Sequence, residues 1–330
     1  MTLIDFQSLY HEQFQQIWKA IESAKKIAVL GTATPDGDSL GAQLALTEAI
    51  ESNLNKKVDC IVLREIPQTL QFLPGIERTI NKDTVDGYDL ICAVDCGEKA
   101  RVPFYEDIIA KKIPLVLFDH HQPKEKFGTF SVTDARISCT GQLLYYFFKA
   151  NNLPITNTMA TNILTCVSYD TGNFQHANTT AEVLEVAAVV APKSMPLAKI
   201  SRSIYRTKSV PVLQLWGRTL KRARLNPKTK MVMSTVTVKD LKETGLTLDK
   251  NNEEIKAVVD LINTTKGSRF TLLLREEEGG GIRASLRSEE DRNVDVAKIA
   301  EMFGGGGHKL SSGFGVKGQL KKAGQSWIVE

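Results

Sequence analysis

The sequence predicts an α/β protein whose larger domain is built on a parallel sheet. Short apolar runs alternate with helical patterns over the first 190 residues, and a second, shorter alternation begins near residue 230. Strands that are buried on both faces are continuous apolar runs, and consecutive parallel strands need crossover helices between them. With 330 residues, the chain is long enough for two domains. We expect a parallel-sheet domain over residues 1–190, a helical linker over 191–229 and a smaller α/β domain over 230–330.

The elements of the first domain follow from the spacing of apolar residues. From Phe6 to Ile21 these residues recur at helical intervals, which predicts an amphipathic helix over about residues 4–24. The other elements expected in this domain are strands at 27–30, 58–63, 90–94 and 115–118 and helices at 39–50, 138–150, 157–168 and 179–190.

A basic stretch separates the two α/β patterns. From Lys193 to Lys239 the chain has twelve Lys or Arg residues and no Asp or Glu. Helices are predicted there at 197–207 and 210–223, either as a solvated connector or as a wall that attracts phosphate. The elements expected after it are strands at 231–238, 269–275 and 282–287 and helices at 253–263 and 294–303.

Composition excludes several classes of function. The 42 Lys and Arg residues barely exceed the 38 Asp and Glu residues, and a net charge of +4 is too small for a protein that coats long nucleic acid. The sequence has no membrane-length apolar run and no signal-peptide pattern at its start. Its five cysteines are odd in number and form no CxxC pair. We therefore expect a protein of the reducing cytoplasm that neither enters a membrane nor binds long nucleic acid.

Acidic and imidazole side chains follow the strands of the first domain. Asp36 and Asp38 come after the first strand, Asp95 after the strand at 90–94, and Asp119-His120-His121 after the strand at 115–118. Ligands of open parallel sheets bind beyond the carboxyl ends of the strands, so these groups should converge. Clustered carboxylates repel one another unless a cation lies between them. Oxygen and imidazole donors without thiolate suit manganese or magnesium better than structural zinc.

Each of these motifs also has a purely structural interpretation. Asp36-Gly37-Asp38 between a strand and a helix is, taken alone, more typical of a turn and helix N-cap. An isolated Asp170 would likewise be a cap or turn residue. Three adjacent titratable groups directly after a buried strand have little structural use, so Asp119-His120-His121 favours the metal-site hypothesis.

The second domain ends in a glycine-rich loop beside a basic strand. Four glycines at 304–307 precede His308 and permit close backbone approach with exposed amides, although such a loop can also be a hinge. In the strand at 282–287, Arg283, Ser285 and Arg287 alternate with apolar or small residues and should share one face. Arginine forks match phosphate geometry. A basic glycine-loop domain beside a carboxylate-rich domain indicates phosphate-ester hydrolysis.

Taken in order, these motifs resemble the DHH/DHHA1 phosphoesterases, especially the nanoRNase and pAp-phosphatase branch that is related to RecJ. The resemblance covers nearly the whole chain. Its evidence is the ordered set Pro35-Asp36-Gly37-Asp38, Val94-Asp95, Asp119-His120-His121, Asp170-Thr171-Gly172-Asn173-Phe174, the strand from Arg283 to Ser288, and Gly304 to His308. It implies a parallel-sheet DHH domain and a smaller α/β DHHA1 domain joined by a helical linker.

The resemblance also implies a site with two Mn²⁺ ions, for which Mg²⁺ could substitute. In that arrangement Asp95 bridges the ions and Asp36 belongs to one of them, and the other is held by Asp38, His120 and Asp170. The catalytic pair would be Asp119, which orients His120, and His121, which faces the substrate phosphate. The substrate-binding residues implied in the second domain are Arg283, Ser285, Arg287, Gly305, Gly306, Gly307 and His308.

One position departs from the family pattern. The family usually has a histidine four residues before the first motif aspartate, where this chain has Thr32. A neutral hydroxyl is a poor ligand by comparison. We therefore predict that one ion binds firmly and that the other binds weakly or only with substrate.

The leading functional expectation is hydrolysis of short oligoribonucleotides or linear dinucleotides to 5′-mononucleotides. Phosphatase action on 3′,5′-bisphosphoadenosine is chemically similar, and cleavage of cyclic dinucleotides is a further alternative. A degenerate nucleotide-binding protein without activity is the alternative that Thr32 suggests. The expected partner is a short RNA or dinucleotide, and the apolar helices after residue 138 could supply a homodimer contact.

Overall fold

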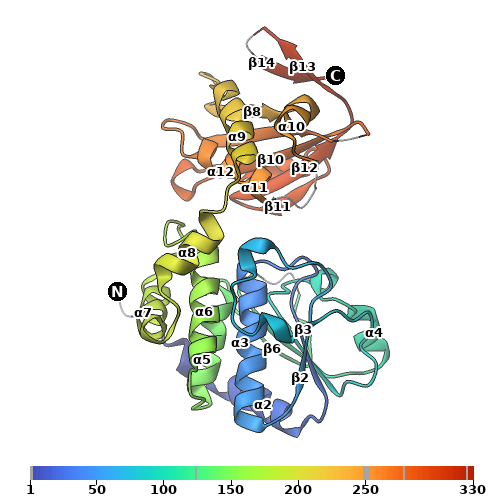
Figure 1. The fold of residues 1–330 in the computed structure, drawn as a ribbon, viewed down its shortest axis with the longest axis vertical. Coiled ribbons are helices and arrows are strands. Elements are labelled where there is room, and N and C mark those ends of the chain that lie inside the picture. Colours follow the sequence, from blue (N-terminus) through green and yellow to red (C-terminus); the bar gives the residue numbers. More distant parts are fainter. Residues whose placement is uncertain (1–2, 123–124, 248–252, 278, 325) are drawn as a thin grey trace. The chain divides into compact units, whose positions relative to one another are not determined.

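The computed structural model describes residues 3–122, 125–247, 253–277, 279–324 and 326–330. Their fold is shown in Figure 1, and the chain divides into two compact units, Met1–Thr207 and Lys208–Glu330. Among the described residues, no helix combines the length and hydropathy needed to span a bilayer.

The first unit contains a parallel sheet of six strands within the described residues. In spatial order these are β3 (Thr79–Ile80), β2 (Val58–Ile61), β1 (Ile27–Leu30), β4 (Leu90–Val94), β5 (Leu115–Asp119) and β6 (Phe130–Thr133). The chain leaves β1 toward one edge of the sheet and returns at β4 to build the other half. The neighbouring strands β1 and β4 therefore mark the point where the strand order reverses, which is the usual ligand-binding place in such sheets.

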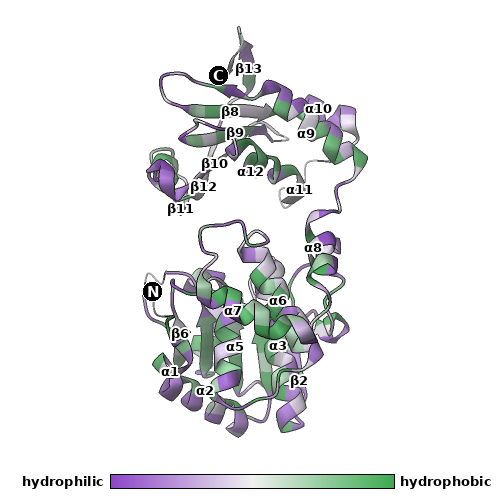
Figure 2. Ribbon diagram, turned by 90° about the vertical axis from the view of Figure 1, so that its left-hand side faces the viewer, coloured by the Kyte–Doolittle hydropathy of each residue, from purple (hydrophilic) through white to green (hydrophobic). Residues whose placement is uncertain are grey.

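Apolar side chains of the strands fill a core on each face of this sheet, and Figure 2 colours these strands as largely hydrophobic. Val29 of β1 packs in one core and its neighbour Ala28 in the other, as the alternation of strand side chains requires. The helices of the unit are α1 (Phe6–Leu9), α2 (His11–Ser23), α3 (Gly37–Leu54), α4 (Tyr105–Ala110), α5 (Thr140–Ala150), α6 (Asn157–Asp170), α7 (Ala181–Val190) and α8 (Leu197–Tyr205).

Three of these helices, α3, α5 and α6, pack closely against one another. Gly41 of α3 and Gly141 of α5 both face Cys166 of α6, and a Cβ atom at either glycine would lie 2.7 Å from the Cys166 Sγ atom. Glycine is thus needed for these helices to approach so closely. This packing brings the N-termini of α3 and α5 to the C-terminus of α6, where the predicted site residues lie.

The second unit contains a mixed sheet. Its six strands are, in spatial order, β11 (Gly306–His308), β12 (Ser311–Val316), β10 (Ile282–Ser288), β9 (Phe270–Glu276), β8 (Met231–Val236) and β7 (Arg224–Leu225). Only β8 and β9 run parallel; the other neighbours are antiparallel. The helices are α9 (Val210–Arg222), α10 (Val238–Thr244), α11 (Glu253–Lys256), α12 (Val258–Asn263) and α13 (Val296–Glu301), and the strands β13 (Leu320–Ala323) and β14 (Ser326–Val329) form a separate hairpin.

The α/β fold predicted from the sequence is confirmed, and several details differ from the prediction. The first helix is divided at Tyr10 into α1 and α2. The short strands β3 and β6 were not predicted, and neither were the strands after residue 304. Within the expected linker, α8 packs on α6 of the first unit and α9 packs on β8 of the second.

Candidate functional site

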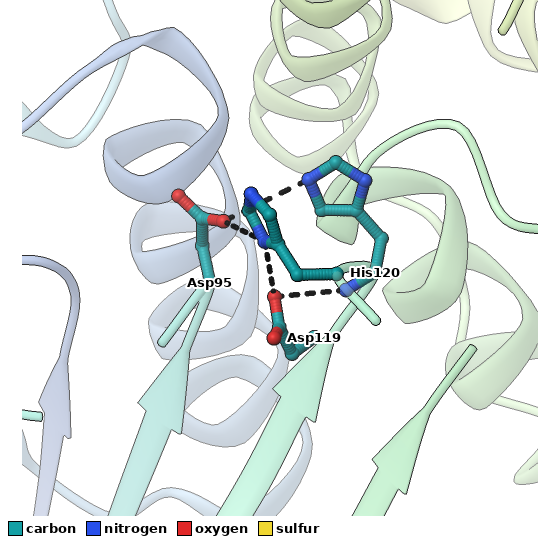
Figure 3. A group of neighbouring side chains, drawn as sticks. Asp95, Asp119 and His120 are labelled. Carbon is teal, nitrogen blue, oxygen red and sulfur yellow. Dashed lines mark hydrogen bonds and ion pairs between the residues drawn. The ribbon is translucent and has the colours of Figure 1, made fainter. Parts of the chain in front are cut away.

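The acidic side chains at the carboxyl edge of the first sheet converge as the sequence predicts. Asp95 follows β4 and Asp119 ends β5, and both are almost fully buried. The backbone N–H of Asp95 donates to the Phe118 carbonyl at 2.9 Å, and its φ angle of 58° turns the chain sharply at that point. Figure 3 shows these side chains with His120 directly beyond the ends of the strands.

The start of α3 contributes two carboxylates with different roles. Asp36 is the N-cap of the helix and accepts hydrogen bonds from the backbone N–H groups of Asp38 at 3.1 Å and Ser39 at 2.9 Å. Asp38 instead lies at the N-terminus of α5. Its Oδ2 atom accepts from the Thr140 N–H at 2.7 Å and its Oδ1 atom from the Gly141 N–H at 3.0 Å. Free N–H groups and the helix dipole stabilise an anion there.

The two histidines are held by Asp119. Its Oδ1 atom accepts from the backbone N–H of His120 and lies 2.9 Å from Nδ1 of His121. The resemblance implied that Asp119 orients the ring of His120, whereas in the structure it contacts the ring of His121 and the backbone of His120. The His120 ring instead has a hydrogen bond with the backbone of Ile137, and its Nε2 atom lies 3.2 Å from Asp170 Oδ2.

Two overlapping sets of donor atoms lie close enough to hold a cation. Asp38, His120 and Asp170 each offer one atom, and these atoms all lie within 4.8 Å of one another; we call this set the metal group. A second set with the same spacing consists of Asp95, Asp119, His120 and His121. Asp36, which caps α3, belongs to neither set.

Burial and mutual repulsion shift the pKa values of these groups. Burial raises the pKa of Asp95 and of Asp170 well above the usual value, and the neighbouring carboxylates add to the shift. Burial likewise raises the pKa of Asp36. Burial lowers the pKa of His120, which favours the neutral ring. Burial acts to raise the pKa of Asp119. The hydrogen bond from His121 and the charges of the two histidines outweigh this effect, so the pKa is lowered.

The residues present fit a divalent cation. Among the described residues, Asp119 Oδ2 and Asp95 Oδ1 are buried oxygens with no hydrogen-bond partner, and Asp95 Oδ1 lies 3.4 Å from Nδ1 of His121, a contact that Figure 3 marks. An unsatisfied buried carboxylate oxygen is costly, and a cation nearby removes that cost. Glycine is needed at position 97, because a Cβ atom there would lie 2.3 Å from Asp119 Oδ2. The oxygen and neutral imidazole donors suit manganese or magnesium.

Thr32 does not replace the missing histidine. Its hydroxyl donates to the Thr34 carbonyl at 2.8 Å and lies 3.3 Å from the Ser39 hydroxyl. The side chain is therefore engaged with the loop that leads into α3.

In the second unit, one face of β10 carries the predicted basic residues. Arg283 is exposed and Ser285 and Arg287 are partly exposed, whereas the residues between them are buried. Arg287 Nε donates to Asp260 Oδ1 of α12 at 2.7 Å. The predicted sharing of one face by these three side chains is thus confirmed.

Strand pairing places the glycine-loop residues beside this face. Ser311 of β12 pairs with both His308 of β11 and Arg287 of β10, so these three residues form one row across the sheet. Gly313 pairs in the same way with Gly306 and Ser285. We call the surface formed by Arg283, Ser285, Arg287, Gly306 and His308 the open face.

The glycines are required by the close approach of β11 to β12. A Cβ atom at Gly305 would lie 2.3 Å from the Gly313 carbonyl oxygen, and Gly307 has a φ angle of 142°. The glycines predicted as a loop therefore enter an edge strand at Gly306, which leaves His308 exposed.

The two α5 amides that hold Asp38 were not predicted from the sequence. Backbone groups leave no side-chain signature, but Cys139-Thr140-Gly141 directly before an apolar run is typical of a helix start. Recognising that helix N-terminus as an anion site could have identified them.

Comparisons with known proteins agree with these features. The model of the DHH family, N-terminal domain, matches residues 26–169, and that of the DHHA1 domain matches residues 230–326. The bifunctional oligoribonuclease and PAP phosphatase NrnA of Thermus thermophilus is 30% identical over 308 residues, which cover 92% of this chain and 87% of that protein. The chain belongs to the DHH/DHHA1 family of phosphoesterases. The family resemblance inferred from the motifs is therefore confirmed.

Two further DHH/DHHA1 comparisons extend over nearly the whole chain. A probable NrnA of Streptococcus mutans is 24% identical over 304 residues, covering 91% of this chain and 92% of that protein. The crystal structure of an exopolyphosphatase-related protein from Bacteroides fragilis superposes with a TM-score of 0.85 at 24% identity, covering 93% of this chain and 92% of that chain. This structural similarity shows the fold alone.

Proposed function

We propose that this DHH/DHHA1 protein is a manganese-dependent phosphodiesterase that hydrolyses short oligoribonucleotides or linear dinucleotides to 5′-mononucleotides. We propose that it also removes the 3′-phosphate of 3′,5′-bisphosphoadenosine. Both substrates present a phosphate beside a nucleoside, so one site suits both. The printed name of the Thermus thermophilus relative combines the same two activities.

The observation that carries the proposal is the metal group with its buried surroundings. Asp38, His120 and Asp170 bring their donor atoms within 4.8 Å of one another at the reversal point of a parallel sheet. The buried Asp95 Oδ1 atom beside them lacks a hydrogen-bond partner in the described part of the chain. Carboxylates this close together repel one another, and a bound cation would relieve that repulsion.

Asp38, His120 and Asp170 would hold one cation, and Asp95, which belongs to the second set with His120, would also serve as a metal ligand. A bound divalent cation supplies positive charge that activates water and stabilises the charge developing on phosphate oxygens. The α5 amides of Thr140 and Gly141 fix the Asp38 carboxylate, so its position does not depend on the ion.

His121 is the side chain best suited to meet the substrate phosphate within this unit. Its Nδ1 atom lies 2.9 Å from Asp119 Oδ1, whose lowered pKa keeps that carboxylate ionised. A carboxylate in this place orients the imidazole ring through its Nδ1 atom. The ring held in this way would contact a phosphate oxygen of the substrate.

The open face of the second unit would bind nucleotide phosphates. Arg283 and Arg287 can pair with phosphate oxygens, and His308 adds a further donor in the same row as Arg287. The glycines of β11 let a substrate approach the backbone. The net charge of only +4 fits a short substrate better than a long nucleic acid.

The test is turnover of a small panel of substrates with added Mn²⁺. The panel contains a 5′-phosphorylated dinucleotide, a short RNA, 3′,5′-bisphosphoadenosine and a cyclic dinucleotide, each repeated with Asp95→Ala. Hydrolysis of the linear dinucleotide, the RNA and the bisphosphate, abolished in the variant, supports the proposal. A preference for the cyclic dinucleotide would replace the substrate assignment. Nucleotide binding without any turnover would indicate a non-catalytic nucleotide-binding protein, in which Thr32 marks the loss of a metal ligand.

A further inference from the structure

Asp170, a member of the metal group, is held through its backbone. It is the last residue of α6, and its carbonyl accepts a hydrogen bond from Asn178 Nδ2 at 3.2 Å. The same carbonyl lies 3.0 Å from His176 Nδ1. The loop after α6 therefore folds back and caps the carbonyl of the residue whose side chain meets His120.

Asn178 makes a second set of contacts, with the segment that precedes α5. Its Nδ2 atom also donates to the Ser138 carbonyl at 3.1 Å, and the Ser138 hydroxyl donates to the Asn178 carbonyl at 2.5 Å. Ser138 is 1% exposed, so this pair of hydrogen bonds fixes the loop to the protein interior. One side-chain amide thus joins the carbonyl of Asp170, at the end of α6, to the carbonyl of Ser138, which precedes α5.

The segment over residues 137–141 supports the other two members of the metal group. The backbone of Ile137 has a hydrogen bond with the ring of His120. The N–H groups of Thr140 and Gly141 hold the Asp38 carboxylate. Asp38 and His120 are therefore tied directly to this five-residue segment. Asp170 is tied to it through Asn178.

We propose that Asn178 is a positioning residue that sets the distance of Asp170 from Asp38 and His120, and so sets the affinity of the metal group for a divalent cation. This inference rests on the proposed metal-dependent function. The amide of Asn178 contacts the backbone carbonyls of Ser138 and Asp170, so it reaches the metal group through the backbone of Asp170. Residues that orient metal ligands in this way typically change metal affinity or activity by about 10- to 100-fold when they are removed.

The test is calorimetric titration of Mn²⁺ into metal-free wild-type protein and Asn178→Ala. We expect the variant to bind the tighter ion about tenfold more weakly. The matched control is Asn151→Ala. Asn151 Nδ2 likewise donates to two backbone carbonyls, those of Phe147 and Phe14, but it does so at the opposite end of α5. This control should retain wild-type affinity.

A second variant keeps the test decisive if Asn178→Ala does not fold. Ser138→Ala removes only the hydroxyl that bonds to the Asn178 carbonyl, and we expect a smaller loss of Mn²⁺ affinity in the same direction. In the double variant the two losses should not add, because both changes weaken the same connection. Thermal melting of each metal-free protein verifies that the fold is intact.

Two results would overturn the proposal. One is unchanged Mn²⁺ affinity in folded Asn178→Ala or, where that variant does not fold, in Ser138→Ala. The other is an equal loss in Asn151→Ala, which would show a general effect on stability. Because metal binding is measured without substrate, wild-type protein that binds Mn²⁺ but hydrolyses no substrate would contradict the proposed function and leave the role of Asn178 measurable.

Discussion

The metal group in the first unit and the open face in the second differ in burial as well as in charge. Asp38 is 1% exposed and is fixed by the amides of α5, whereas Arg283 is exposed on β10. Asp170 of the metal group and the neighbouring Asp95 have pKa values that burial and repulsion from nearby carboxylates raise well above normal. On the open face, the Arg287 guanidinium is already paired with Asp260.

The two regions therefore differ in the physical interactions through which they would bind their ligands. The acids accumulate an electrostatic cost that a cation relieves, so their ligand should be bound strongly and be essential. On the open face, Arg283 is accessible to solvent and Arg287 is paired with Asp260, so each side chain should contribute only part of the binding free energy. Substitutions in the two regions should therefore separate metal affinity from substrate affinity.

The largest effect is expected for Asp38→Asn. Loss of the negative charge should reduce turnover by at least about a thousandfold, because a lost cation removes several kcal/mol of transition-state stabilisation. The measurement is kcat at saturating Mn²⁺, with Asp59→Asn as a control. Asp59 pairs with Lys82 and lies in β2. If the turnover of Asp38→Asn is within a few-fold of the wild-type value, Asp38 is not part of the metal site.

A smaller and different effect is expected for Arg287→Ala on the open face. The KM for a dinucleotide should rise roughly tenfold, since a charged hydrogen bond to phosphate contributes about 1.5–3 kcal/mol. The affinity for Mn²⁺ should stay unchanged. Steady-state kinetics and calorimetry measure the two quantities, and Lys322→Ala in the β13–β14 hairpin is the control. A loss of Mn²⁺ affinity would break the separation between the two regions.

Restoring a histidine at position 32 tests whether the first-unit site is incomplete. In Thr32→His, the weaker of two Mn²⁺ ions should bind roughly tenfold more tightly, because the imidazole adds a ligand that the engaged threonine hydroxyl does not supply. The measurement is a Mn²⁺ titration of both proteins. Thr34→His, two residues along the same loop, should not reproduce the gain. Unchanged affinity in Thr32→His would contradict the weak-site hypothesis.

The smallest effect on turnover is expected for Asp240→Asn, which alters the second unit away from the open face. Burial acts to raise the pKa of Asp240, but hydrogen bonds from Arg222 and Thr237 lower the pKa to about 2. The substitution should reduce the free energy of unfolding by about 1–3 kcal/mol at neutral pH. Turnover of the folded protein should not change.

The pH dependence of this effect has a definite sign. Because the folded-state pKa of Asp240 is below its usual 3.8, the ionised carboxylate stabilises the protein above about pH 4, and this stabilisation is lost as the pH falls toward about 2. The difference between wild type and Asp240→Asn should shrink over that range. Denaturation followed by tryptophan fluorescence measures it, with the exposed Asp291→Asn as control. A constant difference would show that ionisation of Asp240 is not responsible.

The sequence predicted the central strands and the residues of both regions because these depend on local patterns. Buried strands such as Ile27–Leu30 and Leu90–Val94 are continuous apolar runs, and the acids that follow them mark the carboxyl edge. The alternation around Ser285 identified one face of β10 in the same way. The roles assigned to individual site residues remain predictions.

Features that depend on tertiary contacts could not be predicted. The bond between Asp119 and the His121 ring depends on how the chain turns after β5. The support of Asp38 by Gly141 depends on helix packing between residues 103 positions apart. Strand β11 consists of two glycines and His308, which have low strand propensity, and it forms only because β12 offers an edge for pairing.

The most direct test of the metal group is a calorimetric titration of metal-free protein with Mn²⁺, carried out for wild type and for Asp170→Asn. The account predicts that the wild type binds at least one ion tightly and that the variant loses this binding, because the Asp170 carboxylate lies 3.2 Å from His120 Nε2 within the metal group. Equal binding by both proteins, or no binding by the wild type, would contradict the claim that these buried acids form a cation site.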